Sequence, residues 1–221
     1  MPGQKASEET RREQILTAAH AVASRHGIDG LTVRAVADRA KLSHGLVLFH
    51  FKRKDELVTA LLDRVLETAF LLTVSEPVLG LPDPRDRFVG AIRQEMDRLS
   101  QEPRRMRLFF EYWALGSRHS RVRTKVSTAL SSYRAAFRTF AEDALRTDPA
   151  RFRSVTPEGL AAIAVSLITG CAVQAMIDPE GFDISEYRAS AQAVMGHSAT
   201  RATRRGPRVV AAAAVTSATE S

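Results

Sequence analysis

A short polar and basic stretch, SHGLVLFHFKRK, has the chemistry to bind a polyanion. Lys52, Arg53 and Lys54 follow one another, and His44 and His50 precede them. Cationic and polar side chains at a helix surface are the groups that contact nucleic-acid phosphates. The sequence has no phosphate-cradling glycine loop, no paired-cysteine metal spacing and no His-Glu-x-x-His motif. We therefore expect binding rather than catalysis, with no catalytic residues, no metal and no cofactor.

Two short amphipathic helices are predicted to position this stretch. The first begins after Thr32, whose hydroxyl can accept an orphan amide hydrogen of the first turn. Its apolar residues share one helical face, because they are spaced i, i+3, i+4 and i+7: Val33, Val36, Ala37 and Ala40. Ser43 offers a second N-cap. Two short helices joined by a turn of about three residues form a helix-turn-helix.

The second of these helices is expected to expose one face. Val47 and Phe51 are four residues apart and can both face inward. His44, Leu46 and Leu48 are then left pointing outward. The major groove of B-DNA admits a helix of this size. The sequence therefore predicts double-stranded DNA as the partner.

The run from residue 12 to residue 57 resembles the DNA-binding domain of the TetR family of bacterial transcriptional regulators. The segments ILTAAHAVASRHG, GLTVRAVADRA and LSHGLVLFHFKRKDEL carry the resemblance. It implies an all-α, repressor-type homodimer on a palindromic operator. We expect DNA contacts from the two helices and the basic stretch: Thr32, Arg34, Ser43, His44, Gly45, Leu46, Leu48, Phe49, His50, Lys52 and Lys54.

The chain departs from the family pattern in this region. Lys41 stands where the turn usually carries glycine, and Leu46 and Leu48 stand where the family often has threonine and tyrosine. Two hydroxyl contacts to DNA that are common in the family are therefore missing. The resemblance still implies phosphate or base contacts at three matching positions: Arg34, His50 and Lys54.

Composition limits the remaining classes of function. No apolar run approaches the length of about 20 residues that spans a bilayer, so no membrane partner is expected. The N-terminus is polar and resembles no signal peptide, and the single cysteine, Cys171, fits a reducing cytoplasm. The net charge is +7, but much of the excess lies in residues 104–153, with 12 Lys+Arg against 4 Asp+Glu. A solvated helical face is the favoured explanation of that excess over a nucleic-acid contact.

The rest of the chain is predicted to be a helical bundle, because no period-2 strand pattern occurs in it. Helices are expected at 55–76, 85–101, 104–117, 120–145, 158–177 and 184–195. We predict a DNA-binding domain at 8–54, an effector-binding and dimerisation domain at 55–196 and a disordered basic tail at 197–221. PRRMRLFFEYWALGSR and QAMIDPEGFDISEY resemble the betaine-type regulator subgroup.

The bundle also carries candidate effector-binding residues. They are large and apolar or aromatic, which predicts a small apolar or aromatic molecule as the effector: Met96, Met106, Phe109, Phe110, Trp113, Tyr133, Phe137 and Phe140. For any single one of them, a place in the ordinary core is the favoured alternative. Glu111 stands within the aromatic stripe, where a salt bridge with a nearby arginine is favoured over a role in a pocket.

Helix 158–177 is a candidate for the dimer interface, since it has more apolar surface than one bundle face needs. The residues expected at the interface are Leu167, Gly170, Cys171 and Gln174. Small residues on the same helix would permit close approach of a second copy: Gly170, Cys171, Ala172 and Ala175. The alternative is the central helix of a monomer.

Two functions from other classes stay open at this stage. A sequence-tolerant architectural DNA-binding protein would use the basic surface and the tail, without a dyad or base-facing side chains. A small-molecule-modifying enzyme with a vestigial DNA-binding head would need a catalytic constellation, which the sequence does not offer.

Overall fold

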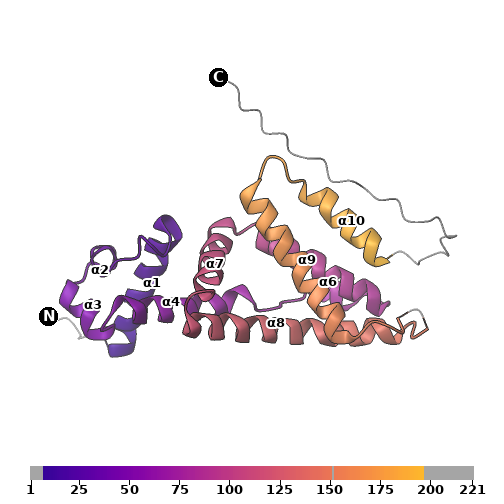
Figure 1. The fold of residues 1–221 in the computed structure, drawn as a ribbon, viewed down its shortest axis with the longest axis horizontal. Coiled ribbons are helices and arrows are strands. Elements are labelled where there is room, and N and C mark those ends of the chain that lie inside the picture. Colours follow the sequence, from indigo (N-terminus) through magenta and orange to yellow (C-terminus); the bar gives the residue numbers. More distant parts are fainter. Residues whose placement is uncertain (1–6, 151, 197–221) are drawn as a thin grey trace, which may run out of the picture.

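The computed structural model describes residues 7–150 and 152–196, and these fold as helices and loops without a strand (Figure 1). A head of three helices lies at one end: α1 (Glu8–His26), α2 (Val33–Ala40) and α3 (His44–His50). From the head, α4 (Lys54–Ala69) runs into the bundle. The all-α prediction is confirmed. The predicted disordered tail at 197–221 lies outside the described residues.

The bundle follows α4. Its helices are α5 (Glu76–Leu79), α6 (Pro84–Ser100), α7 (Pro103–Gly116), α8 (Ser120–Arg146), α9 (Pro157–Ile177) and α10 (Ile184–Gly196). In Figure 1, α8 runs along the base of the bundle and α9 crosses it. The helices begin where the sequence offers them caps. Asp83 and Thr156 accept amide hydrogens from the first turns of α6 and α9, and prolines open α6, α7 and α9.

The predicted helix over residues 55–76 was too long. The structure ends α4 at Ala69, and residues 71–75 are not helical. Phe70 turns into the core instead, where its ring meets Phe109 at 4.7 Å and Tyr133 at 5.2 Å between centroids. The extended segment is tied to α6, because Gln94 accepts a hydrogen bond from the amide of Ser75 at 3.0 Å. Tertiary packing overrides the local helical pattern here.

Helix α9 corrects the prediction that no apolar run approaches the length that spans a bilayer. It is long and apolar enough, by length and composition, to cross a bilayer. In the structure it packs against α6, α8 and α10. Ala164, Ile168 and Cys171 on it have no exposed surface. Its apolarity is therefore that of a core helix whose neighbours cover several sides.

A charged residue lies in the middle of the bundle core. Glu95 on α6 has no exposed surface, and it accepts a hydrogen bond of 2.5 Å from the hydroxyl of Tyr133 on α8. The guanidinium of Arg98 lies 2.6 Å from the same carboxylate. Burial, followed by the nearby charge of Glu95, raises the pKa of Tyr133, so its hydroxyl stays a donor. A buried carboxylate needs all of these partners.

Removing one partner should therefore destabilise the bundle. We expect Tyr133→Phe to lower the free energy of unfolding by about 2 kcal/mol, since a hydrogen bond to a buried charge is lost. Tyr187→Phe is the matched control; its hydroxyl donates to the carbonyl of Leu167 at 3.2 Å. We expect it to cost about 0.5–1 kcal/mol. Urea unfolding at one protein concentration measures both. Equal losses would contradict the special role of Glu95.

Candidate nucleic-acid interface and ligand pocket

The two helices of the helix-turn-helix begin as the sequence predicts. The hydroxyl of Thr32 accepts the amide hydrogen of Ala35 at 3.1 Å, and that of Ser43 accepts the amide hydrogen of Leu46 at 3.2 Å. Val47 is fully buried, and so is Phe51, which ends α3. The inward-facing pair is thereby confirmed. The opposite face of α3 is turned to solvent.

That outer face combines an open backbone with apolar side chains. His44, Gly45 and Leu48 are exposed, and Phe49 keeps 72% of its surface accessible. A Cβ placed on Gly45 would meet no atom within 4 Å, so a partner can approach the first turn of α3 closely. Leu46 is only half-buried. Exposed phenylalanine and leucine on a short helix are typical of a contact surface.

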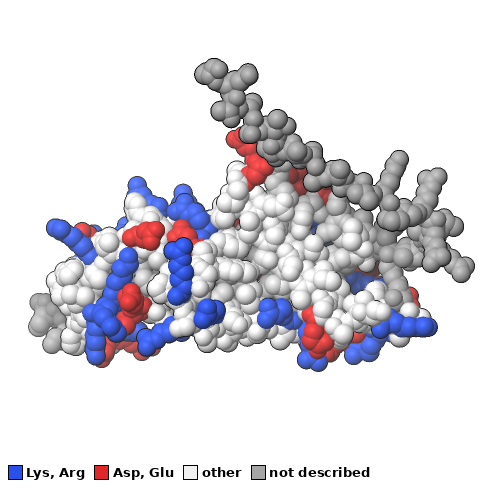
Figure 2. All heavy atoms as spheres, viewed as in Figure 1, with Lys and Arg blue, Asp and Glu red and all other residues white. Residues whose placement is uncertain are grey.

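Cationic residues lie next to this face. Lys52 and Lys54 are exposed, and neither forms an ion pair within the part of the chain that the structure describes. Arg53 is 4.0 Å from Glu56, and Arg34 is exposed on α2. Figure 2 shows acidic side chains among the lysines and arginines of the head. The positive charge near α3 therefore belongs to a few separate side chains and not to a continuous basic surface. Such side chains suit contacts with individual phosphates.

Helix α1 holds α2 and α3 in place. The side-chain amide of Gln14 donates a hydrogen bond of 3.0 Å to the carbonyl of Ala40, at the end of α2. Arg12 donates to the carbonyl of His50 at 3.1 Å, at the end of α3, and its guanidinium stacks over Phe51 at 4.3 Å from the ring centroid. These bonds satisfy carbonyls that a helix end leaves without a partner. Sequence analysis did not identify Arg12 or Gln14.

Lys41 makes the turn between the two helices with a strained backbone. Its φ is 56° and its ψ is 44°, in the left-handed region that glycine adopts without strain. The conformation costs about 1–2 kcal/mol for a residue with a side chain. The amide of Lys41 bonds to the carbonyl of Asp38 at 3.3 Å. The chain thus keeps the turn despite the missing glycine.

A carboxylate joins the head to the bundle. Glu111 on α7 accepts a hydrogen bond of 2.7 Å from the backbone amide of Ile28, just after α1. The preceding Gly27 has φ +72°, and a Cβ there would lie 3.0 Å from Glu111 Oε2. Arg107 lies 3.6 Å from the other carboxylate oxygen, which confirms the expected salt bridge. The contact with Ile28 was not predicted, since the two residues are far apart in the sequence.

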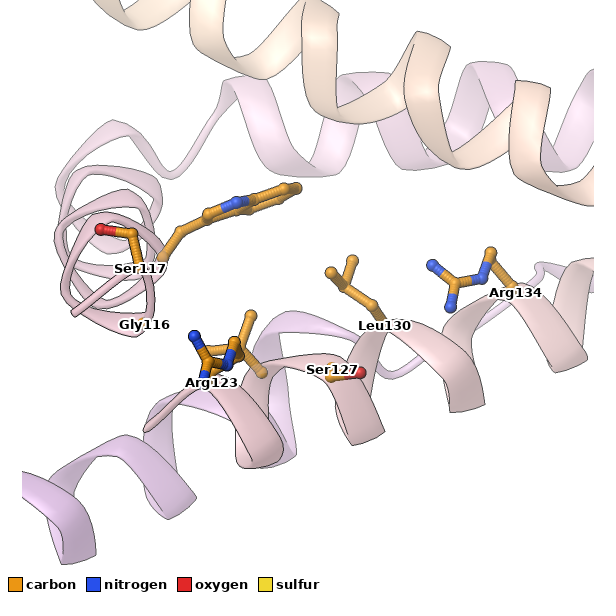
Figure 3. Close-up of a pocket in the computed structure, with 8 residues that line it drawn as sticks. Gly116, Ser117, Arg123, Ser127, Leu130 and Arg134 are labelled. Carbon is orange, nitrogen blue, oxygen red and sulfur yellow. The ribbon is translucent and has the colours of Figure 1, made fainter. Parts of the chain in front are cut away.

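A hollow of about 260 Å³ lies between the end of α7 and the first half of α8 (Figure 3). Figure 3 shows Gly116 at the end of α7, Ser117 just after it, and residues from successive turns of α8 on the other side of the hollow. The hollow combines an indole, two guanidinium groups, two hydroxyls and two aliphatic side chains: Trp113, Gly116, Ser117, Arg123, Val126, Ser127, Leu130 and Arg134.

Trp113 is the one predicted effector residue that lines this hollow. Five of the others are fully buried in the core: Met96, Met106, Phe109, Tyr133 and Phe137. Phe110 and Phe140 are half-buried and pack against that core. The structure therefore favours the core alternative for these seven, and an effector role for them stays a prediction. A helical wheel of α8 could have revealed the polar lining residues, but the sequence analysis followed only its apolar stripe.

The predicted dimer residues on α9 do not share one environment. Leu167 and Gly170 are half-buried, and Gln174 is exposed. Cys171 is fully buried in its own chain, which favours the core alternative for it, and its role at an interface stays a prediction. Burial also raises the pKa of its thiol. The exposed apolar residues of this region are Ile163, Ile177 and Val194, at 51%, 72% and 80% accessible.

Comparison with known proteins agrees with this architecture. Residues 15–61 match the bacterial regulatory proteins of the tetR family, and residues 84–202 match the C-terminal domain of BetI-type transcriptional repressors. A relative from Xanthobacter autotrophicus, named an uncharacterized HTH-type transcriptional regulator in the dhlA 5′ region, is 30% identical over 81% of this chain and 87% of its own length. BetI of Burkholderia ambifaria is 29% identical over 48% of this chain, which spans about half (55%) of that regulator.

Solved structures share the fold at low sequence identity. A transcriptional regulator from Saccharomonospora viridis, solved with choline, is 18% identical with a TM-score of 0.66, over 86% of this chain and 97% of its own. A TetR transcription regulator from Haloarcula marismortui is 18% identical with a TM-score of 0.69, over 85% and 97%. The head, the bundle and these matches together show that the chain belongs to the TetR family of helix-turn-helix transcriptional regulators.

Proposed function

We propose that this regulator is a cytoplasmic, homodimeric repressor that leaves a palindromic operator when a small molecule binds in its bundle. The observation that carries the proposal is the outer face of α3. Gly45 leaves room for close approach, Leu48 and Phe49 are exposed, and Lys52 and Lys54 flank them without ion pairs among the described residues. Such a face can read base edges while the lysines hold phosphates.

Exposed apolar surface on α9 and α10 supports the homodimer. Ile163, Ile177 and Val194 are all at least half accessible. Ile163 lies near the start of α9, Ile177 ends it and Val194 lies on α10, so exposed apolar side chains accompany the last two helices over their length. A second copy related by a two-fold axis would cover these side chains on both chains. The same axis would place two α3 helices on DNA, which is why we propose a palindrome.

Helix α7 supports control by a ligand. Glu111 contacts the head through Ile28, and Trp113, two residues later, lines the hollow. A ligand can release DNA only if it binds the released state more tightly than the DNA-bound state. BetI-type names and the choline complex of the Saccharomonospora regulator favour a repressor with a small-molecule effector. We also propose that the two domains divide at residues 54 and 55, at the start of α4, which leads from the head into the bundle.

The dimer and the palindrome can be tested together. Light scattering should give the mass of a dimer at micromolar concentration. Footprinting on a site selected from random DNA should give two protected half-sites about one helical turn, or roughly 34–36 Å, apart. A monomer in solution, or a footprint without a dyad, would refute the proposal and favour the architectural alternative.

Lys54 should contribute affinity rather than specificity. We expect Lys54→Ala to weaken binding to selected and random DNA alike and to reduce the slope of log K against log salt by about 0.9, since one phosphate contact is lost. Arg93→Ala removes the same charge from an exposed position on α6 and serves as the control. Titrations at several salt concentrations measure the slope. Loss of affinity for the selected site alone would make Lys54 a specificity residue.

Thymine methyl groups should meet the apolar side chains of α3. Leucine and phenylalanine can neither donate nor accept hydrogen bonds, and the apolar feature of the major groove is the thymine methyl. Replacing thymine with uracil under α3 should weaken binding about fourfold for each contacted methyl, or ~0.8 kcal/mol. Uracil outside the half-sites is the control. Unchanged affinity at every half-site position would show that Leu46, Leu48 and Phe49 do not read the groove.

A further inference from the structure

We propose that the hollow between α7 and α8 binds a small amphipathic anion, a carboxylate on an apolar or aromatic body, and not a quaternary ammonium cation. The inference deepens the proposed function, because it assigns the effector site and its ligand chemistry. It rests on the residues that line the hollow, on their charge and on their spacing along α8.

The polar residues of the hollow share one face of α8. Arg123, Ser127, Leu130 and Arg134 are spaced i, i+4, i+7 and i+11, which keeps them within one stripe of a helix. The two arginines are separated by about 16 Å along the helix axis, at 1.5 Å per residue. Figure 3 shows Leu130 between them, on the side that faces α7. The stripe thus alternates cation, hydroxyl, apolar side chain and cation.

The lining carries positive charge without compensation. No carboxylate lines the hollow, and neither Arg123 nor Arg134 forms an ion pair among residues 7–150 and 152–196. Arg134 is half-buried and donates a hydrogen bond to the hydroxyl of Ser131, at 3.1 Å. Other hollows differ in this respect, since Asp63 and Glu67 accompany Lys125 in the one between α4 and α8. Guanidinium groups in such a setting favour a planar carboxylate and repel a cation.

The remaining lining residues suit the body of such a ligand. Trp113, Val126 and Leu130 supply aromatic and aliphatic surface, and the indole is held by stacking on Phe110 at 5.9 Å. Ser117 and Ser127 add hydroxyl groups. A volume of about 260 Å³ equals the space of roughly nine water molecules in the liquid. A compound of about ten non-hydrogen atoms, such as phenylacetate, has the matching size.

Trp113 also provides the assay, because it is the only tryptophan in the chain. The intact protein is titrated with phenylacetate, with its neutral isostere phenylacetamide, and with benzyltrimethylammonium and choline as cations. We expect the fluorescence of Trp113 to change with phenylacetate below about 1 mM and to require at least tenfold more phenylacetamide. The cations should produce no saturable change. A charge-assisted contact to a guanidinium accounts for the difference of tenfold or more.

Variants then assign the contact to the arginines. Arg134→Gln should weaken the binding of phenylacetate at least tenfold. Arg123→Gln should weaken it about threefold, since Arg123 is exposed and its charge is screened. In both variants the affinity for phenylacetamide should stay within about twofold of the wild-type value. Arg121→Gln, an exposed position on the same helix outside the hollow, is the matched control and should have no effect. Thermal unfolding checks that each variant is folded.

Operator release is measured separately, by anisotropy of labelled DNA. Phenylacetate that binds as expected but leaves the operator bound would uphold the anion site and refute effector control. Release by choline, with no response of Trp113 to phenylacetate, would uphold effector control and overturn the anion site. The anion site is also overturned if no binding of phenylacetate occurs below about 1 mM, or if Arg134→Gln binds it like the wild type.

Discussion

One hydrogen bond between a side chain and the backbone joins the head to the bundle where α1 packs on α7. The carboxylate of Glu111 takes up the amide hydrogen of Ile28, at the point where α1 has ended and the chain turns toward α2. The approach is possible because Gly27 has a positive φ and no Cβ. An amide in this buried turn would otherwise lack a partner, which is costly. This contact adds to the packing of α1 on α4 and α7, which together hold the head against the bundle.

Three consecutive residues of α7 contact three different parts of the molecule. Glu111 contacts the head, the hydroxyl of Tyr112 donates to the carbonyl of Val58 on α4 at 2.8 Å, and Trp113 lines the hollow. Burial raises the pKa of Tyr112, so its hydroxyl remains a donor. Helix α4 is also in contact with α1. A shift of α7 therefore reaches the head by two routes, through the turn after α1 and through α4.

The sequence was sufficient for features that depend on neighbouring residues. The caps at Thr32 and Ser43 and the inward position of Val47 follow from local spacing and hydrogen bonding, and the structure has them. It was insufficient where distant residues decide the outcome. The end of α4 depends on Phe70 packing against α7 and α8, and the contact of Glu111 depends on the backbone of Ile28. Neither neighbour is visible from periodicity.

The hollow shows why family membership decides the fold but not the ligand. The choline-bound regulator from Saccharomonospora viridis shares this fold at 18% identity, so its lining residues need not be shared. Helix α8 is held by Val122, Val126 and Tyr133, which face the core. Residues on the adjoining stripe can change without loss of that packing. Arg123 and Arg134 lie on this stripe, so the charge that lines the hollow can differ between proteins that share the fold.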